Sequence, residues 1–208
     1  MVEPAVLPGF LLVVLLICVA PGPDMAFIIA MSIDRGWRVG LQSAIGMAIG
    51  MAVWTVATAI GLAALLHAAP AALDAIRVVG AGYLLWLGFT TLRSARASSI
   101  SEEAPASTGR NLVVRGMLTN LANPKIAVFF AAFLPQFVRT AAGPASLQLL
   151  ALGGLFLVTG LGVDSLVALA AGRLRLALHP GGRMATGLSV TAGVVLCALA
   201  VGLAAEVA

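Results

Sequence analysis

Pro21-Gly22-Pro23-Asp24 interrupts the first apolar segment of this 208-residue chain, and Asn123-Pro124-Lys125 interrupts another apolar segment in its second half. A helix surrounded by hydrocarbon has strong physical reasons to avoid prolines, a carboxylate and an ammonium group. Two such breaks at corresponding places, carrying opposite charges, are typical of a binding site built from discontinuous membrane helices. These two stretches therefore predict a membrane protein with two broken helices.

The overall composition supports the same prediction. Hydrophobic residues make up 61% of the chain and charged residues only 10%, and the mean hydropathy is +1.09. A soluble domain carries roughly 25% charged residues, because it must present a hydrated surface. Repeated apolar runs of about 20 residues are long enough to cross a hydrocarbon core of ~30 Å. The composition excludes an ordinary soluble domain and predicts a polytopic α-helical membrane protein.

The apolar runs divide the chain into six expected spans within a single transporter domain, residues 1–208. The spans are residues 8–33, 39–66, 71–92, 113–138, 146–171 and 184–205. The breaks fall in the first and fourth spans, so two three-span halves, 1–93 and 112–208, are joined by a polar linker at 94–111. Because each half has an odd number of spans, the second half is expected to be inverted relative to the first. The predicted fold is an all-α bundle of two inverted halves in which helices one and four are broken.

The distribution of arginines predicts the orientation. Only Arg77 and Arg139 lie on one side, whereas the joints after the first, third and fifth spans hold Arg35, Arg38, Arg93, Arg96, Arg110, Arg173, Arg175 and Arg183. The positive-inside rule then places the linker in the cytoplasm and both termini outside. Since these arginines lie between apolar runs, the net charge of +4 indicates membrane topology and no nucleic-acid partner. The first apolar run lacks a basic n-region and is long, so we expect a retained transmembrane helix.

The prolines place unsatisfied backbone groups inside the hydrocarbon layer. Proline lacks an N–H and clashes with the carbonyl four residues earlier, so Pro21, Pro23 and Pro124 free carbonyls that protein, water or ligand must satisfy. Proline is also favourable at the first position of a helix. We therefore expect Pro23 to begin one half-helix and Asn123 to cap another that begins at Pro124. Helix N-termini suit anions, and freed carbonyls suit cations.

These groups together predict a site for a small zwitterion. Lys125 and the half-helix N–H groups would bind a carboxylate, and Asp24 would bind an ammonium group. Local helix energetics do not explain Lys125, since a cation opposes the dipole at a helix N-terminus. The candidate substrate-binding residues are Asp24, Lys125, Asn123, Asn120, Pro23 and Pro124. Asp24 and Asp164, an intramembrane carboxylate of the fifth span, are candidates for a proton relay.

Structural explanations stay open for the same residues. Asp24 and Lys125 could form a buried ion pair without a ligand, and the prolines could be ordinary kinks. Asp164 could be a relay, or a carboxylate satisfied by an arginine or by backbone. The pairs Gly36/Gly40 and Gly46/Gly50 have the spacing for close helix contact, either within one chain or across a homodimer face.

The sequence resembles the LysE/RhtB family of bacterial amino-acid exporters along nearly its whole length. The resemblance rests on the stretches at 21–24, 35–50 and 82–93, and above all on Gly116-Met117-Leu118-Thr119-Asn120-Leu121-Ala122-Asn123-Pro124-Lys125, followed by 129–137. It implies export of small amino acids or derivatives, such as threonine, homoserine or their lactones, by proton antiport across the bacterial inner membrane. It implies no enzymatic activity, no cofactor and no metal. Met51 departs from the pattern, because relatives often carry an acidic residue there.

Three other functions compete with this prediction. An intramembrane thiol oxidoreductase needs two cysteines that can meet, but Cys18 precedes the first break while Cys197 lies in the sixth span. A hydrolase needs a nucleophile with a histidine or acidic partner, and no span contains a histidine. An exporter of a metal or another small ion would use soft ligands for soft metals. The lysine argues against a site for cations alone.

Overall fold

A computed structural model describes residues 2–68 and 109–173, together with six isolated positions, 78, 82, 85, 86, 89 and 194. These parts of the chain contain six α-helices and no strand, which confirms the all-α class. Apart from the isolated positions, the expected spans 71–92 and 184–205 lie outside the described residues, as does most of the linker. The arrangement of six spans in two inverted halves therefore stays a prediction.

The first expected span consists of two helices joined at the proline break. A short 3-10 turn, Pro4–Val6, precedes α1, which comprises Leu7–Val19, and α2 comprises Pro23–Arg35. The two helices are bent by 53° relative to each other, and α2 begins at Pro23 as predicted. At the end of α2, Gly36 has a φ of 93°, a left-handed conformation that glycine adopts without strain.

The fourth expected span is broken in the same way. The helices α5 (Gly109–Leu121) and α6 (Pro124–Val128) flank the break. A π-helical turn, Phe129–Phe133, and a 3-10 turn, Leu134–Phe137, continue α6, and the two parts of this span are bent by 51°. The two breaks therefore bend their spans to nearly the same degree.

The starts of α5 and α6 test two predictions. Asn123 caps α6, because its side-chain oxygen accepts a hydrogen bond from the backbone N–H of Lys125 at 3.0 Å. The predicted cap is thereby confirmed. Helix α5 begins at Gly109, so the last residues of the expected linker, 94–111, are helical.

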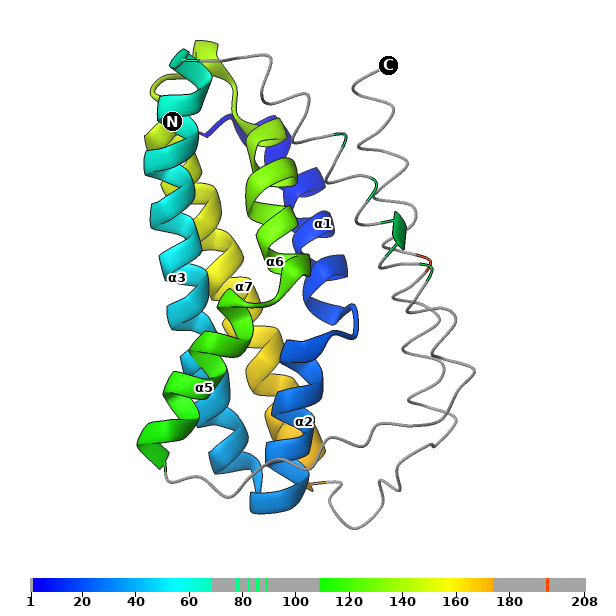
Figure 1. Cartoon of the computed structure of the whole chain (residues 1–208). Coiled ribbons are helices and arrows are strands. Elements are labelled where there is room, and N and C mark those ends of the chain that lie inside the picture. The colour runs from blue at the N-terminus through cyan, green and yellow to red at the C-terminus, as the bar shows by residue number, and fades with distance from the viewer. Residues whose placement is uncertain are drawn as a thin grey trace.

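The second and fifth expected spans are continuous helices, α3 (Trp37–Ala68) and α7 (Ala145–Arg173). Two helices of the described residues are long and apolar enough to cross a membrane, and up to four spans result if each bent pair is one span. Helices α3 and α7 run side by side, and both broken pairs pack against them (Figure 1). In that view the chain descends through α1 and α2 and ascends through α5 and α6, with both breaks near mid-height.

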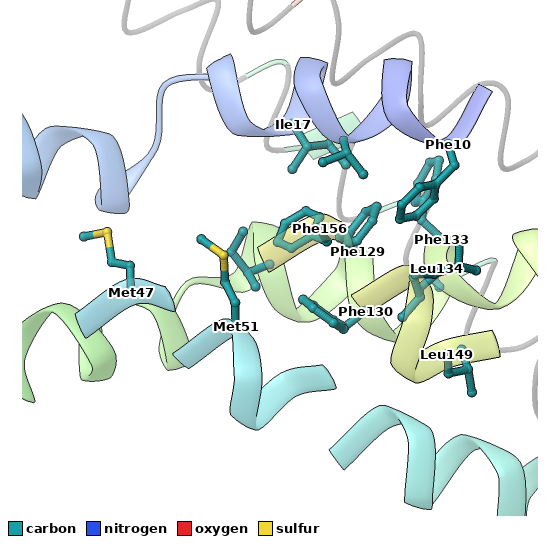
Figure 2. Close-up of a cluster of buried hydrophobic side chains, with 14 of the residues drawn as sticks. Phe10, Ile17, Met47, Met51, Phe129, Phe130, Phe133, Leu134, Leu149 and Phe156 are labelled. Carbon is teal, nitrogen blue, oxygen red and sulfur yellow. The ribbon is translucent and has the colours of Figure 1, made fainter. Parts of the chain in front are cut away.

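Aromatic side chains join α1, α7 and the π-helical turn above the breaks. Phe10, Phe129, Phe130 and Phe156 are all 0% exposed. The rings of Phe129 and Phe156 stack with centroids 4.5 Å apart, and the ring of Phe10 lies 6.3 Å from that of Phe129 (Figure 2). Such clusters combine large apolar burial with favourable ring geometry. This packing holds α1 against the continuation of α6.

Glycines bring α3 and α5 into backbone contact below the breaks. A Cβ on Gly46 would overlap the carbonyl of Val113, and one on Gly116 would overlap the carbonyl of Ser43. The helices can approach this closely only because neither glycine carries a side chain. Contact within one chain is confirmed for Gly40, Gly46 and Gly50; Gly36 has no described atom within 4 Å of a Cβ and serves the turn instead.

Candidate functional site

The two breaks bring the predicted polar residues together in the middle of the bundle. Pro23 and Pro124 begin α2 and α6, and the side chains beside them are buried in protein. The exposed fractions are 6% for Asp24, 0% for Asn120, 1% for Asn123 and 3% for Lys125. A charged or amide group at this depth must find partners in the protein or in a ligand.

Lys125 reaches across to the end of α1. Its Nζ donates hydrogen bonds to the backbone carbonyl of Ala20 at 2.8 Å and to that of Ile17 at 3.1 Å. The carbonyl of Ile17 is the one that Pro21 frees, four residues later. It binds a cation as predicted for freed carbonyls, and that cation is the protein's own lysine. Because an ammonium group has three N–H donors, one remains for a ligand.

This contact explains why a lysine is tolerated at the start of α6. The ammonium group opposes the dipole of its own helix, yet it lies at the C-terminus of α1, where carbonyls carry partial negative charge. The sequence of α6 alone does not indicate this contact, because the carbonyls lie at the end of α1. Lys125 is also the only lysine in the chain, a signal that the sequence did offer.

Asp24 is held from the opposite break. It lies in the first turn of α2, and its Oδ2 accepts a hydrogen bond from Asn120 Nδ2 at 2.9 Å. Asn120 belongs to the last turn of α5. The other carboxylate oxygen, Oδ1, is buried and has no partner among the described residues. One oxygen of Asp24 is therefore fixed, and the other is available to a ligand.

The two breaks are thus tied to each other reciprocally. The residue after each helix-starting proline binds the end of the half-helix that precedes the other break. Lys125 does so through the carbonyls of α1, and Asp24 does so through Asn120 of α5. Within the described chain, no nitrogen–oxygen contact within 4.0 Å joins Asp24 to Lys125 directly. The simple buried ion pair is therefore not the arrangement that the structure has.

Several atoms at the breaks are buried without a hydrogen-bond partner in the described structure. Two are acceptors, Oδ1 of Asp24 and Oδ1 of Asn120, and one is a donor, Nδ2 of Asn123. Each buried polar group that stays unsatisfied costs about 1–3 kcal/mol. Acceptors and a donor left free at one place are the complement of a small molecule that carries both kinds of group.

Asp164 lies on α7, with 6% of its surface exposed. Its Oδ2 has no partner among the described residues, so neither an arginine nor backbone satisfies it there. One turn earlier, a Cβ on Gly160 would lie 2.9 Å from Met51 Sδ and 3.7 Å from Cys18 Sγ. The α7 helix thus passes the end of α1 one turn away from Asp164.

The described residues offer little support for the thiol oxidoreductase or for a metal site. Cys18 is a free cysteine, and Cys197 lies outside the described residues. No group of three or more His, Cys, Asp and Glu residues among the described positions could hold a metal ion. Two further buried polar atoms, Ser32 Oγ and Trp54 Nε1, also lack partners among the described residues. A serine or tryptophan within an apolar helix gives no sequence signal for this.

Apolar helices that break at the same depth, with charged and amide groups at the breaks, define a membrane transport protein. The chain belongs to the family described as LysE type translocator, whose sequence profile matches residues 15–207. Members of this family are transporters and not enzymes. No solved structure is significantly similar to this chain.

Several curated proteins are similar to the chain. An uncharacterized membrane protein of Pseudomonas aeruginosa is 35% identical over 134 residues, which cover 62% of each chain. A homoserine/homoserine lactone efflux protein of Salmonella typhimurium is 33% identical over 159 residues, 76% of this chain and 75% of that protein. A threonine efflux protein of Escherichia coli K12 is 34% identical over 125 residues, 57% of this chain and 60% of that protein. The match covers less than two thirds of the Pseudomonas and Escherichia proteins.

Proposed function

We propose that this protein is a secondary active exporter of small amino acids or their derivatives, of the threonine, homoserine and homoserine lactone class. The observation that carries the proposal is the set of buried, unpartnered atoms at the breaks, on Asp24, Asn120 and Asn123. An ammonium group needs acceptors and a carboxylate needs donors, and both are present within one site. The efflux relatives support the same substrate class.

The substrate is oriented by charge. Its ammonium group binds Oδ1 of Asp24 and Oδ1 of Asn120, which are the free acceptors. The carboxylate of an amino acid, or the ester carbonyl of a lactone, accepts from Nδ2 of Asn123 and the remaining N–H of Lys125, with the N-terminal turn of α2 adding favourable dipole charge for a carboxylate. Gly22 immediately precedes this turn. A Cβ at Gly22 would lie 3.2 Å from Lys125 Nζ and would narrow the space between the breaks.

Proton antiport follows from competition for one carboxylate. When Asp24 is ionised, it provides the counter-charge that a substrate ammonium group needs in a low-dielectric site. When Asp24 takes up a proton, that counter-charge disappears, and the substrate loses its principal partner. Binding of the proton and of the substrate thus exclude each other. Asp164, the second carboxylate with an unpartnered oxygen, serves as the next proton acceptor on the path.

The remaining features complete a six-span transporter in the bacterial inner membrane, with the spans 71–92 and 184–205 added to those described. The opposite directions of α1–α2 and α5–α6 support two inverted halves (Figure 1). The arginine pattern supports a cytoplasmic linker and external termini. A homodimer is compatible with this arrangement and is not required by the site, whose residues come from one chain.

Transport into proteoliposomes tests the proposal. Radiolabelled threonine, homoserine and leucine would be offered with and without an imposed pH gradient. Gradient-dependent accumulation is expected for at least one of them, and Asp24→Asn is expected to abolish it. Asp34→Asn is the matched control, because that carboxylate is 60% exposed at the end of α2. If no candidate accumulates under either condition, the proposed function is wrong.

A further inference from the structure

Three buried hydroxyl groups of α2 and α3 differ in how they are satisfied. Ser43 Oγ donates to the carbonyl of Val39 at 3.2 Å, and Thr55 Oγ1 donates to that of Met51 at 2.8 Å. This bond to the preceding turn is usual for a hydroxyl within a helix. Ser32 is 0% exposed, yet its Oγ has no partner among the described residues. Its hydroxyl is therefore free to bond to a group that the described chain does not supply.

Ser32 lies where α2, α3 and α7 meet. Gly40 of α3 makes the room, because a Cβ there would overlap Ser32 Oγ and lie 2.9 Å from the Cβ of Ala168. Ala168 follows Asp164 by one turn of α7, which is about 5.4 Å along the helix axis. Ser32 therefore lies at the level of Ala168, one helical turn of α7 away from Asp164, whose Oδ2 also has no partner among the described residues.

The same interface leads back to the breaks. Gly160, one turn before Asp164, lies beside Cys18 in the last turn of α1. On α2, Ser32 follows Asp24 by slightly more than two turns, about 12 Å along the helix axis. Three buried groups with unpartnered oxygens therefore follow one another from the break along α2 and α7, in the order Asp24, Asp164 and Ser32.

In the other direction, Ser32 is close to the end of the bundle. Helix α2 ends one turn later at Arg35, and Gly172 near the end of α7 contacts Trp37 at the start of α3.

Arg115 of the neighbouring α5 lies over the ring of Phe27. The ionisable groups on α2, α3 and α7 around Ser32 are Asp24, Asp164, Asp34, Arg35, Arg38 and Arg173. Among the described residues of these helices, no buried carboxylate lies between Asp164 and this end, since Asp34 is 60% exposed and paired with Arg35.

We propose that Ser32 is a proton-relay residue between Asp164 and this end of the bundle, which the arginine pattern assigns to the cytoplasm. The proposal rests on the proton antiport proposed above. A single water on either side of the hydroxyl spans one helical turn with two hydrogen bonds of about 2.8 Å each. In each transfer Ser32 Oγ accepts a proton from one water and releases its own hydroxyl proton to the next. Serine is neutral before and after, and one proton passes from the carboxyl of Asp164 to solvent.

Two activities of reconstituted protein separate this role from a structural one. Exchange of labelled for unlabelled substrate needs no net proton transfer, whereas net transport against a pH gradient does. Ser32→Ala is expected to retain exchange and to slow substrate-coupled proton flux, followed with a trapped pH-sensitive dye, at least tenfold. Ser43→Ala removes an equally buried hydroxyl that already has a partner, so both activities are expected to stay unchanged.

The remaining outcomes each decide the question. Unchanged coupled flux in Ser32→Ala would overturn the relay. Loss of exchange together with coupled flux would also overturn it, because the residue would then be structural. The coupled proton flux of Asp164→Asn alone is expected to equal that of the double variant Asp164→Asn with Ser32→Ala. The two substitutions block the same path, so the second adds no further loss. If the unmutated protein exchanges substrate but shows no proton flux during net transport, the antiport itself fails, which is distinguishable from failure of Ser32 alone.

Discussion

The Nζ of Lys125 donates a hydrogen bond to the backbone carbonyl of Ala20 at 2.8 Å, across 105 residues of sequence. The start of α6 is thereby joined to the end of α1, in the middle of the bundle. A cation at a helix C-terminus satisfies carbonyls and also compensates the helix dipole. The side chain that we propose to bind substrate therefore also joins the two halves of the chain. Binding and helix contact depend on one ammonium group.

Replacement of Lys125 by methionine removes that group at nearly constant length. We expect Lys125→Met to abolish transport and to lower the thermal midpoint in detergent. The carbonyls of Ile17 and Ala20 would lose their bonds, at about 1–3 kcal/mol for each buried group left unsatisfied. Arg139→Met, which removes an exposed cation, is the control for both measurements. A stable Lys125→Met variant with normal transport would exclude both roles.

Asn123 has two functions that different substitutions separate. Its oxygen caps α6, and its Nδ2 is the free donor. Asn123→Ser keeps a capping oxygen, so the thermal midpoint is expected to stay near that of the unmutated protein. Substrate affinity is expected to fall roughly tenfold, because the shorter serine side chain does not place its O–H at the position of Nδ2. Asn123→Ala should lose both, with about 1 kcal/mol of stability. Equal affinities for the serine variant and the unmutated protein would contradict the donor role.

Asn120 positions Asp24. Asn120→Leu has similar volume but loses both Nδ2, which now binds Oδ2 of Asp24 at 2.9 Å, and Oδ1, the acceptor proposed for the substrate. Since hydrogen bonds to charged groups contribute about 1.5–3 kcal/mol, we expect an apparent KM for substrate at least tenfold higher. The control is Thr119→Val, a change of the same kind one residue earlier. If the two variants have the same KM, Asn120 does not position the carboxylate.

How much of this site the sequence predicts depends on the range of the interaction. The prolines mark both breaks, and Asn123 marks the start of α6, because these effects act within one turn of helix. The partners of Lys125 and Asp24 are not predictable in this way, since they lie on the other half of the chain. The sequence also gives no sign of the free hydroxyl of Ser32. A serine in an apolar helix ordinarily bonds to its own backbone.

In the fold, too, some features are predictable from the local sequence and others depend on contacts with distant parts of the chain. Hydropathy places α3 and α7 within a few residues, because spanning the membrane requires a minimum apolar length. The π-helical turn at Phe129–Phe133 is different, since it arises where aromatic side chains from α1 and α7 pack against it. Its position depends on tertiary contacts, which periodicity along one helix does not contain.

The glycines between α3 and α5 provide a test of the packing. Gly46→Ala would drive a methyl group into the carbonyl of Val113, so the helices must separate and the protein should be destabilised by several kcal/mol. Gly154→Ala on α7 is the matched control, because no described atom lies within 4 Å of a Cβ there. Alanine in an open helical position is expected to be neutral or to stabilise by about 0.5–1 kcal/mol. Thermal unfolding in detergent compares the two, and equal midpoints would contradict the close contact.

The central claim is that a small zwitterion binds between the breaks with its carboxylate on Lys125. Because this is the only lysine, protein made with lysine labelled with 15N at Nζ carries a single labelled ammonium group. Its NMR signal would be followed during titration with an exported amino acid and with the matching amine that lacks the carboxylate. A saturable shift with the amino acid, and none with the amine, is the predicted result. A signal that does not move with an amino acid that the same preparation transports would contradict the claim.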